Sequence, residues 1–257
     1  MSDLFEKIAS QQGITNQSQY GMSCDMKKTQ YILELLGKAI DADTLKCLLT
    51  AGEQGMEMNS YSTETMAPAE FQSELQKISP FGITPCLKEA DFMVCGAKAI
   101  LAFIDARGLG YSLSPLNAAL VAMQNYWSDI AVKQLAPIAQ FLINQKVHEA
   151  VDEEQTAIQI NSLHLYLNAL DGQLRNNKYI VCNKYTWADL HWTAYIHLIV
   201  IAGESNLIDK YKNVAAWWQK IKTKKSQCGQ DLVAYDLLPS LDDIKTGRLQ
   251  SVEIQDY

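Results

Sequence analysis

The chain has 257 residues, of which 48% are hydrophobic, and a formal net charge of −7. This composition excludes a disordered chain and allows one large or two small globular domains with a sizeable core. The negative charge argues against general nucleic-acid binding, although it leaves room for a local basic patch.

The six cysteines are scattered along the chain without a Cys-x-x-Cys pair, and several lie in apolar runs. They indicate buried, reduced thiols and argue against a disulfide framework or a zinc site. The first residues have neither the apolar core of a secretory signal nor the Arg-rich, acid-poor character of a transit peptide. We therefore expect a cytoplasmic protein without a resident metal.

The first part of the chain has the pattern of an α/β domain. Residues 1–28 are polar apart from one short amphipathic piece, and we interpret them as an N-terminal extension. Residues 29–109 follow the order β–α–β–α–β–β–α. The expected strands cover residues 31–36, 56–61, 83–87 and 92–95, and the expected helices start near Asp41 or Asp43, at Pro68 and at Ala97. Pro85 would remove a ladder donor, which predicts a sheet edge or a special backbone geometry there.

Residues 110–228 show helical periods and no strand signal. The expected helices cover residues 114–143, with a kink at Pro137, and then residues 149–174, 186–203 and 214–221. Residues 229–257 are acidic and only weakly periodic. We expect this tail to be laid over the body of the protein or to be partly free.

The run from Thr186 to Gly203 is apolar on almost every side of a helical wheel, which predicts a helix in the core. It is too often interrupted by charged and polar residues to be a membrane span, which needs about 20 apolar residues. Thr186 and Asp189 have the spacing of a capping box, in which the hydroxyl and the carboxylate satisfy the first amides of the helix.

An α/β half followed by a helical half, with Pro80-x-Gly82-x-x-Pro85-x-Leu87 in the first and Thr186-x-x-Asp189 in the second, resembles the glutathione transferase superfamily. The segment Asn213-Val214-x-x-Trp217 also looks like one of its motifs. The resemblance implies a thioredoxin-like domain followed by an all-helical domain. It further implies that the Thr84–Pro85 bond is cis and that the backbone of Thr84 pairs with the cysteinyl part of glutathione.

The residues that would perform the chemistry depart from this family. By its spacing, Ala42 occupies the position where the family has a Ser or Cys, and the neighbouring acids would repel a thiolate. Gly96 and Ala97 stand where the family has an acid or Gln followed by Ser, which contact the γ-glutamyl end. We therefore expect Thr84, Pro85, Gly96 and Ala97 to form a vestigial glutathione pocket, with no catalytic residue.

The second half is also similar to the transferase-like domains of translation elongation factor one gamma and of scaffold proteins of the aminoacyl-tRNA synthetase complex. This likeness favours a non-catalytic interaction module, with no cofactor, that binds a protein partner or a second copy through its helical domain. Tyr126 and Trp127 are the expected interface residues, because residues 114–174 carry more apolar surface than one inward face requires. The alternative is a divergent glutathione transferase that conjugates or reduces small electrophiles, with a hydroxyl or thiol from Tyr31 or Ser23.

Several other groups of residues receive structural interpretations. His191 and His197 lie on different sides of the expected core helix and cannot bind the same metal ion. We therefore expect both to be core histidines. Trp217 and Trp218, beside several lysines, could stack on RNA, but a core tryptophan and a solvated lysine face are favoured. Cys86 and Cys95 are interpreted as core thiols rather than a redox pair, and Asp41 and Asp43 as helix caps rather than an acid/base pair.

Overall fold

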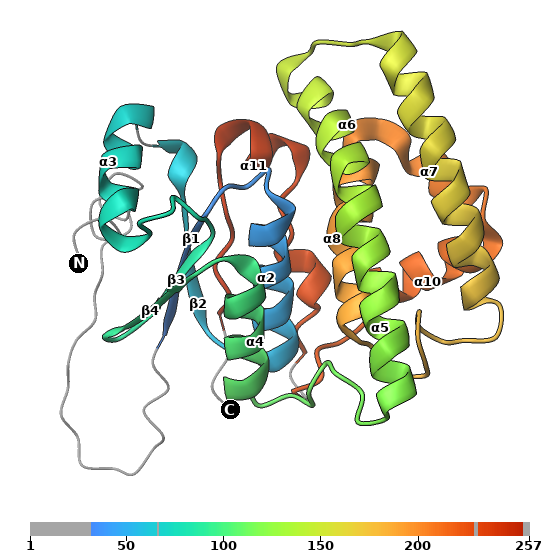
Figure 1. Cartoon of the computed structure of the whole chain (residues 1–257), viewed down its shortest axis with the longest axis horizontal. Helices are drawn as coiled ribbons and strands as arrows, with labels where there is room; N and C mark the ends of the chain where they lie inside the picture. The colour runs from blue at the N-terminus through green and yellow to red at the C-terminus, as the bar shows by residue number, and fades with distance from the viewer. Residues whose placement is uncertain (1–31, 66, 229–230, 254–257) are drawn as a thin grey trace.

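The computed structural model describes residues 32–65, 67–228 and 231–253 (Figure 1). The expected N-terminal extension and both alternative thiol activators, Ser23 and Tyr31, lie outside these residues. Among the described residues, no helix is both long enough and apolar enough to cross a membrane. The cytoplasmic location stays a prediction.

The α/β half contains a four-stranded sheet with the strand order β2-β1-β3-β4. The strands are β1 (Leu33–Gly37), β2 (Met58–Ser62), β3 (Cys86–Glu89) and β4 (Phe92–Cys95), and the helices are α2 (Ala42–Gln54), α3 (Pro68–Ile78) and α4 (Ala97–Arg107). Strands β1 and β2 are parallel, whereas β3 is antiparallel to both β1 and β4. The expected order of elements is therefore confirmed.

The two faces of the sheet are covered by different helices. Helix α3 packs on one face, around Leu36, Tyr61 and Cys86, and helices α2 and α4 cover the other (Figure 1). Because side chains alternate along a strand, Leu35 and Leu36 point to opposite faces. Helices α2 and α4 thus lie between the sheet and the helical half of the chain.

The helical half is built around α8 (Trp187–Ile199), the expected core helix. The other α-helices are α5 (Ala118–Ile130), α6 (Ala136–His148), α7 (Glu153–Leu174), α9 (Ser205–Asp209) and α10 (Lys212–Thr223). Helices α5 and α6 are joined by a five-residue π-helical segment that ends just before Pro137. This wider turn accommodates the proline, which cannot donate its backbone hydrogen bond.

The expected capping box is present at the start of α8. The Asp189 carboxylate accepts hydrogen bonds from the backbone amide and the hydroxyl of Thr186, both at 3.0 Å. It also accepts from the Ile180 amide at 3.0 Å and from the Trp217 indole at 2.9 Å. Burial raises the pKa of Asp189 to about 6, against the opposing effect of these hydrogen bonds. One side chain therefore joins the helix start, the preceding loop and α10.

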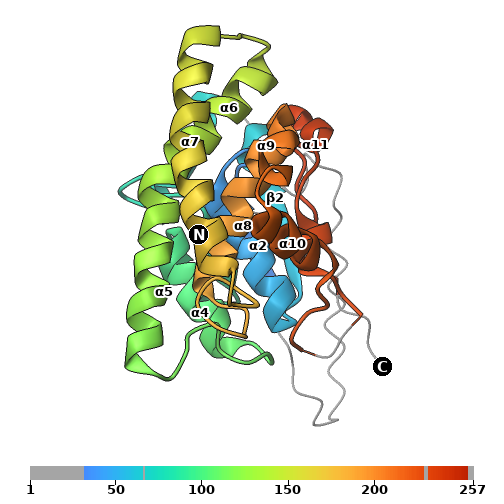
Figure 2. The ribbon, with the colours of Figure 1, turned by 90° about the vertical axis from the view of Figure 1, so that its right-hand side faces the viewer.

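The C-terminal segment packs on the body of the protein. It forms a short 3₁₀ helix (Ala234–Leu237) and helix α11 (Leu241–Thr246), and Val252 pairs with Met58 on strand β2. In Figure 2, α7 and this red segment lie on opposite sides of α8. The expectation of a tail laid over the body is confirmed for the described part, while the domain boundaries stay predictions.

Candidate functional site

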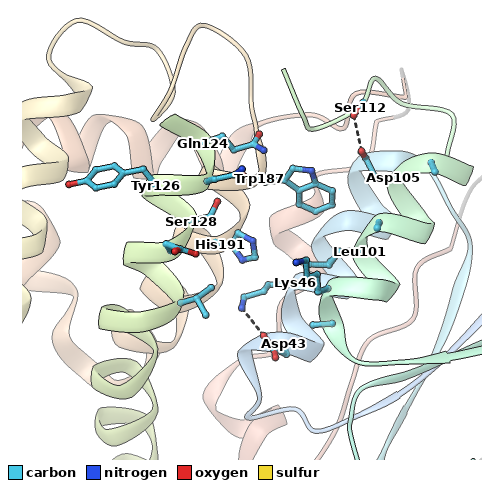
Figure 3. A pocket seen from close by; sticks show the side chains of 17 residues that line it. Asp43, Lys46, Leu101, Asp105, Ser112, Gln124, Tyr126, Ser128, Trp187 and His191 are labelled. Carbon is cyan, nitrogen blue, oxygen red and sulfur yellow. Dashed lines mark hydrogen bonds and ion pairs between the residues drawn. The ribbon is translucent and has the colours of Figure 1, made fainter. Parts of the chain in front are cut away.

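The two halves of the chain enclose a cavity of about 990 Å³ at their junction (Figure 3). Helices α2 and α4 form one wall, and helices α5 and α8 form the other. The cavity is lined by Asp43, Lys46, Ala97, Lys98, Leu101, Ala102, Asp105, Ala106, Ser112, Gln124, Asn125, Tyr126, Ser128, Asp129, Val132, Trp187 and His191. This mixture of apolar and hydrogen-bonding side chains is typical of a site for a small molecule.

The wall formed by α5 and α8 carries three buried polar atoms without a hydrogen-bond partner. They are Gln124 Oε1, Ser128 Oγ and His191 Nδ1, and each lies below the molecular surface. Burial lowers the pKa of His191 to about 3, so its ring is neutral at physiological pH. Because unpaired buried polar atoms are costly, this wall is suited to a ligand that supplies hydrogen bonds.

A buried lysine lies at the start of α2, on the opposite wall. Lys46 is only 2% exposed, and its ammonium group donates to Asp43 Oδ1 at 2.6 Å and to the Tyr195 hydroxyl at 2.7 Å. Tyr195 comes from α8. Asp43 and Tyr195, together with Asp41 and Ala42, also line a smaller adjoining cavity of about 390 Å³. The start of α2 therefore lies between the two cavities.

The Tyr195 hydroxyl is our candidate to replace the hydroxyl that is missing at Ala42. It accepts a hydrogen bond from Lys46, and no acceptor for its own proton is present among the residues that the structure describes. Burial raises the pKa of Tyr195, and the neighbouring Lys46 ammonium group opposes this rise. Lys46 and Tyr195 were missed by sequence reasoning because they are separated by 149 positions.

Of the predicted glutathione-binding residues, Thr84, Pro85 and Gly96 line neither of the two cavities described. The Thr84–Pro85 bond is cis, as predicted, and Pro85 precedes the central strand β3 instead of lying at a sheet edge. The Gly96 amide donates to the Pro85 carbonyl oxygen at 2.8 Å, which brings the two loops together. Ala97 lines the larger cavity, and the N-cap residue of α4, Gly96, provides no side chain to cap the first amides.

The structure places the other expected residues as follows. Asp41 is the N-cap of α2, where its carboxylate accepts from the Asp43 amide at 3.1 Å, so the capping interpretation is confirmed for Asp41.

Of the two expected interface residues, Tyr126 is 57% exposed, but Trp127 is only 5% exposed and stacks at an angle on Trp192 in the core. The expectation that Trp127 offers an interface surface is therefore wrong. Successive helix residues point about 100° apart, so Tyr126 and Trp127 cannot share a face.

Comparison with known proteins identifies relatives over most of the chain. Residues 134–226 match the family model of the glutathione S-transferase C-terminal domain. Glutathione S-transferase F14 of Arabidopsis thaliana is 28% identical over 188 residues, which cover 69% of this chain and 74% of the relative. Glutathione S-transferase F13 of the same plant is 26% identical over 204 residues, 74% of this chain and 90% of the relative. The chain is thus similar to glutathione S-transferases over most of its length.

Solved structures agree on the fold. The structure of glutathione transferase F2 from Populus trichocarpa superposes with a TM-score of 0.67 at 17% identity, over 84% of this chain and all of that chain. The predicted fold class, a thioredoxin-like domain followed by a helical transferase domain, is thus confirmed.

The comparisons correct the expected function. The similar curated proteins carry the name of an enzyme, glutathione S-transferase, and not that of a translation factor or scaffold. The expectation of a non-catalytic interaction module in the translation apparatus is therefore wrong. It rested on the departures at Ala42, Gly96 and Ala97, and on the likeness of the second half to transferase-like domains of the translation machinery.

Proposed function

We propose that this protein is a glutathione transferase that joins the thiol of glutathione to small electrophiles. The observation that carries the proposal is the similarity to named glutathione S-transferases, which extends over 90% of the length of one of them. The cavity of about 990 Å³ between the two halves supports it, because it offers room for both reactants.

Three groups of this chain would hold glutathione. The backbone of Thr84, before the cis proline, would pair with the cysteinyl part. The first amides of α4, at Ala97 and Lys98, are not capped by a side chain and would bind the γ-glutamyl carboxylate at the positive end of the helix. The exposed Lys98 adds a positive charge there. These groups would take over the role of the acid or Gln and the Ser that Gly96 and Ala97 lack.

Tyr195 would activate the thiol. Glutathione reacts as the thiolate, and a free thiol has a pKa of about 8.5, so a hydrogen bond to the sulfur is needed at neutral pH. Tyr195 lines the smaller adjoining cavity together with Ala42, and its hydroxyl accepts a hydrogen bond from Lys46. It would keep its proton and donate a hydrogen bond to the thiolate sulfur, which stabilises the thiolate until the sulfur attacks the electrophile.

We further propose that two copies associate through α5. Tyr126 and Met123 expose apolar side chains on this helix, and Tyr126 also lines the cavity. An exposed aromatic side chain of this kind is a common anchor of protein interfaces.

The function is tested on the purified full-length protein. Binding to immobilised glutathione and turnover of chlorodinitrobenzene with glutathione should both be measured, with heat-denatured protein as the control. We expect specific elution by free glutathione and turnover above the uncatalysed rate. Neither binding nor turnover with this or other electrophile classes would refute the proposal.

A further inference from the structure

Cys86 and Cys95 are directly opposite each other on the antiparallel strands β3 and β4. The next pair along the ladder, Pro85 and Gly96, is hydrogen-bonded, with 2.8 Å between the Gly96 nitrogen and the Pro85 oxygen. Because hydrogen-bonded and non-hydrogen-bonded pairs alternate, Cys86 and Cys95 form a non-hydrogen-bonded pair. In such pairs the Cα atoms are about 4.5 Å apart and the side chains approach most closely.

This spacing is compatible with a disulfide bond. Disulfides need Cα atoms about 4.4–6.8 Å apart, which an opposed pair of this class satisfies. Its Cβ atoms are typically about 4.5–5.5 Å apart, slightly more than the 3.5–4.5 Å found in disulfides. Closing the bond therefore has to draw the two strands together, and bonds of this kind are easily reduced.

The two thiols have different surroundings. Cys86 is fully buried beneath α3, against Leu36 and Phe71. Cys95 is partly exposed on the edge strand β4. The hydrogen bond from the Cys86 thiol lowers the pKa of Cys95, while the same contact and burial raise the pKa of Cys86. An accessible, more acidic thiol thus lies against a buried, less acidic one, which is the arrangement of an attacking and a resolving cysteine.

We propose that Cys86 and Cys95 form a reversible redox pair whose oxidant is hydrogen peroxide. The Cys95 thiolate attacks one peroxide oxygen, the O–O bond breaks, and Cys95 becomes a sulfenic acid while hydroxide leaves. The Cys86 thiol then attacks the Cys95 sulfur, and its proton leaves with the sulfenic oxygen as water. Two thiols are oxidised to one disulfide, and one peroxide is reduced to two waters. A thiol such as dithiothreitol reverses the process by exchange.

This modification site goes beyond the proposed function and does not depend on it. Each cysteine adjoins one of the loops that would hold glutathione, because Cys86 follows Pro85 and Cys95 precedes Gly96. The oxidised pair would fix these two loops to each other by a covalent bond, in addition to the hydrogen bond between Gly96 and Pro85.

The test is peptide mapping of the native, full-length protein after brief exposure to hydrogen peroxide. Trypsin cleaves after Lys88, between the two cysteines, and gives peptides 78–88 and 89–98 with one cysteine each. After the free thiols are alkylated, we expect these peptides to be joined in the oxidised sample and separate after treatment with dithiothreitol. The proposal is overturned if native wild-type protein oxidises at other cysteines without joining them, or joins them only after unfolding in urea.

Variants separate the two steps. Cys95→Ala should abolish both the sulfenic acid and the linked peptides, whereas Cys86→Ala should leave a Cys95 sulfenic acid that dimedone traps. Cys182→Ala is the matched control, and it should form the linked peptides as the wild type does. If dimedone labels Cys95 as strongly in the wild type as in Cys86→Ala, Cys86 does not resolve the sulfenic acid, and the proposal is contradicted. If Cys86→Ala fails to fold, the wild-type peptide map alone decides.

Discussion

The His197 imidazole is joined to the Pro239 carbonyl oxygen by a hydrogen bond of 2.9 Å from Nε2. Since Nε2 has to be the donor to a carbonyl, Nδ1 of the neutral ring accepts from the Tyr235 hydroxyl, 3.1 Å away. His197 belongs to the core helix, and both of its partners belong to the C-terminal segment. The neutral form of one buried side chain therefore holds the end of the chain against the core.

This relationship predicts a pH dependence of stability. Burial lowers the pKa of His197 from 6.5 to about 4, so only the unfolded chain takes up its proton between these values. The contribution of His197 is complete above pH 6.5 and is lost as the pH falls towards 4. At about 1.4 kcal/mol per pKa unit, we expect the stability difference between wild type and His197→Gln to shrink by about 2 kcal/mol from about pH 7.5 to about pH 5. Urea unfolding of both proteins at the two pH values measures this difference in free energy of unfolding.

Wild type has to be compared with His197→Gln because Asp189 affects the pH dependence of stability in the opposite direction. Its pKa is raised from 3.8 to about 6, so its contribution is complete below pH 4 and is lost as the pH rises through 6. His148→Gln, at an exposed position, is the control for the substitution itself. An unchanged difference for His197→Gln would show that its proton does not govern the docking of the C-terminal segment.

Asp189→Ala should be strongly destabilising. The substitution leaves the Thr186 amide, the Ile180 amide and the Trp217 indole buried without an acceptor, at about 1–3 kcal/mol each. We expect the free energy of unfolding in urea to fall by at least about 3 kcal/mol. Asp243→Ala removes the same capping motif from the short helix α11 and should cost only about 0.5–2 kcal/mol. Equal losses would contradict the role assigned to the additional partners of Asp189.

Tyr195→Phe should lower kcat/KM with glutathione by at least about tenfold at neutral pH, because the donor to the thiolate is removed. Its deficit should narrow as the pH approaches about 8.5, where free glutathione ionises by itself. The matched control is Tyr166→Phe, whose hydroxyl donates to Gln134 on the surface of the helical half. A pH–rate profile of Tyr195→Phe that coincides with the wild type would exclude this hydroxyl from the reaction.

Gly96→Ala should destabilise the protein by about 1–2 kcal/mol and weaken glutathione binding. Gly96 has a φ of 93°, which side chains rarely adopt, and an added Cβ would lie 3.3 Å from Ile83 Cγ2. Gly172→Ala is the counterpart in an ordinary helix with open space around it, and it should stabilise by about 0.5–1 kcal/mol. Thermal unfolding and calorimetric titration with glutathione measure both effects. If Gly96→Ala binds glutathione with wild-type affinity, the backbone conformation at Gly96 is not needed for glutathione binding.

Tyr126→Ser should weaken self-association without unfolding the protein. The side chain is 57% exposed, so its loss creates no internal cavity. We expect light scattering to show a dimer for the wild type and an increased share of monomer for Tyr126→Ser. Tyr111→Ser, at another exposed tyrosine, should leave the dimer intact. A monomeric wild type at high concentration would refute the proposed association.

Local features were predictable from the sequence, and long-range ones were not. The capping box, the Asp41 cap and the cis proline each depend on a few consecutive residues, so the sequence pattern was sufficient. The pairing of Lys46 with Tyr195 depends on how the two halves dock, and the pairing of Cys86 with Cys95 depends on strand register. A helical period also does not tell which of Tyr126 and Trp127 points inward, and here Trp127 does because it fills space against Trp192.

The pairing of Val252 with Met58 has a further consequence for the behaviour of the protein in concentrated solution. Strand β2 is an edge strand, and its Met58 amide and carbonyl are both bonded to Val252, at 3.0 and 2.8 Å. The Ser60 amide donates to the Ser251 hydroxyl. The end of the chain thus occupies groups that would otherwise accept a strand from another molecule. A chain shortened before residue 251 would lose this protection, and we expect it to give a lower soluble yield.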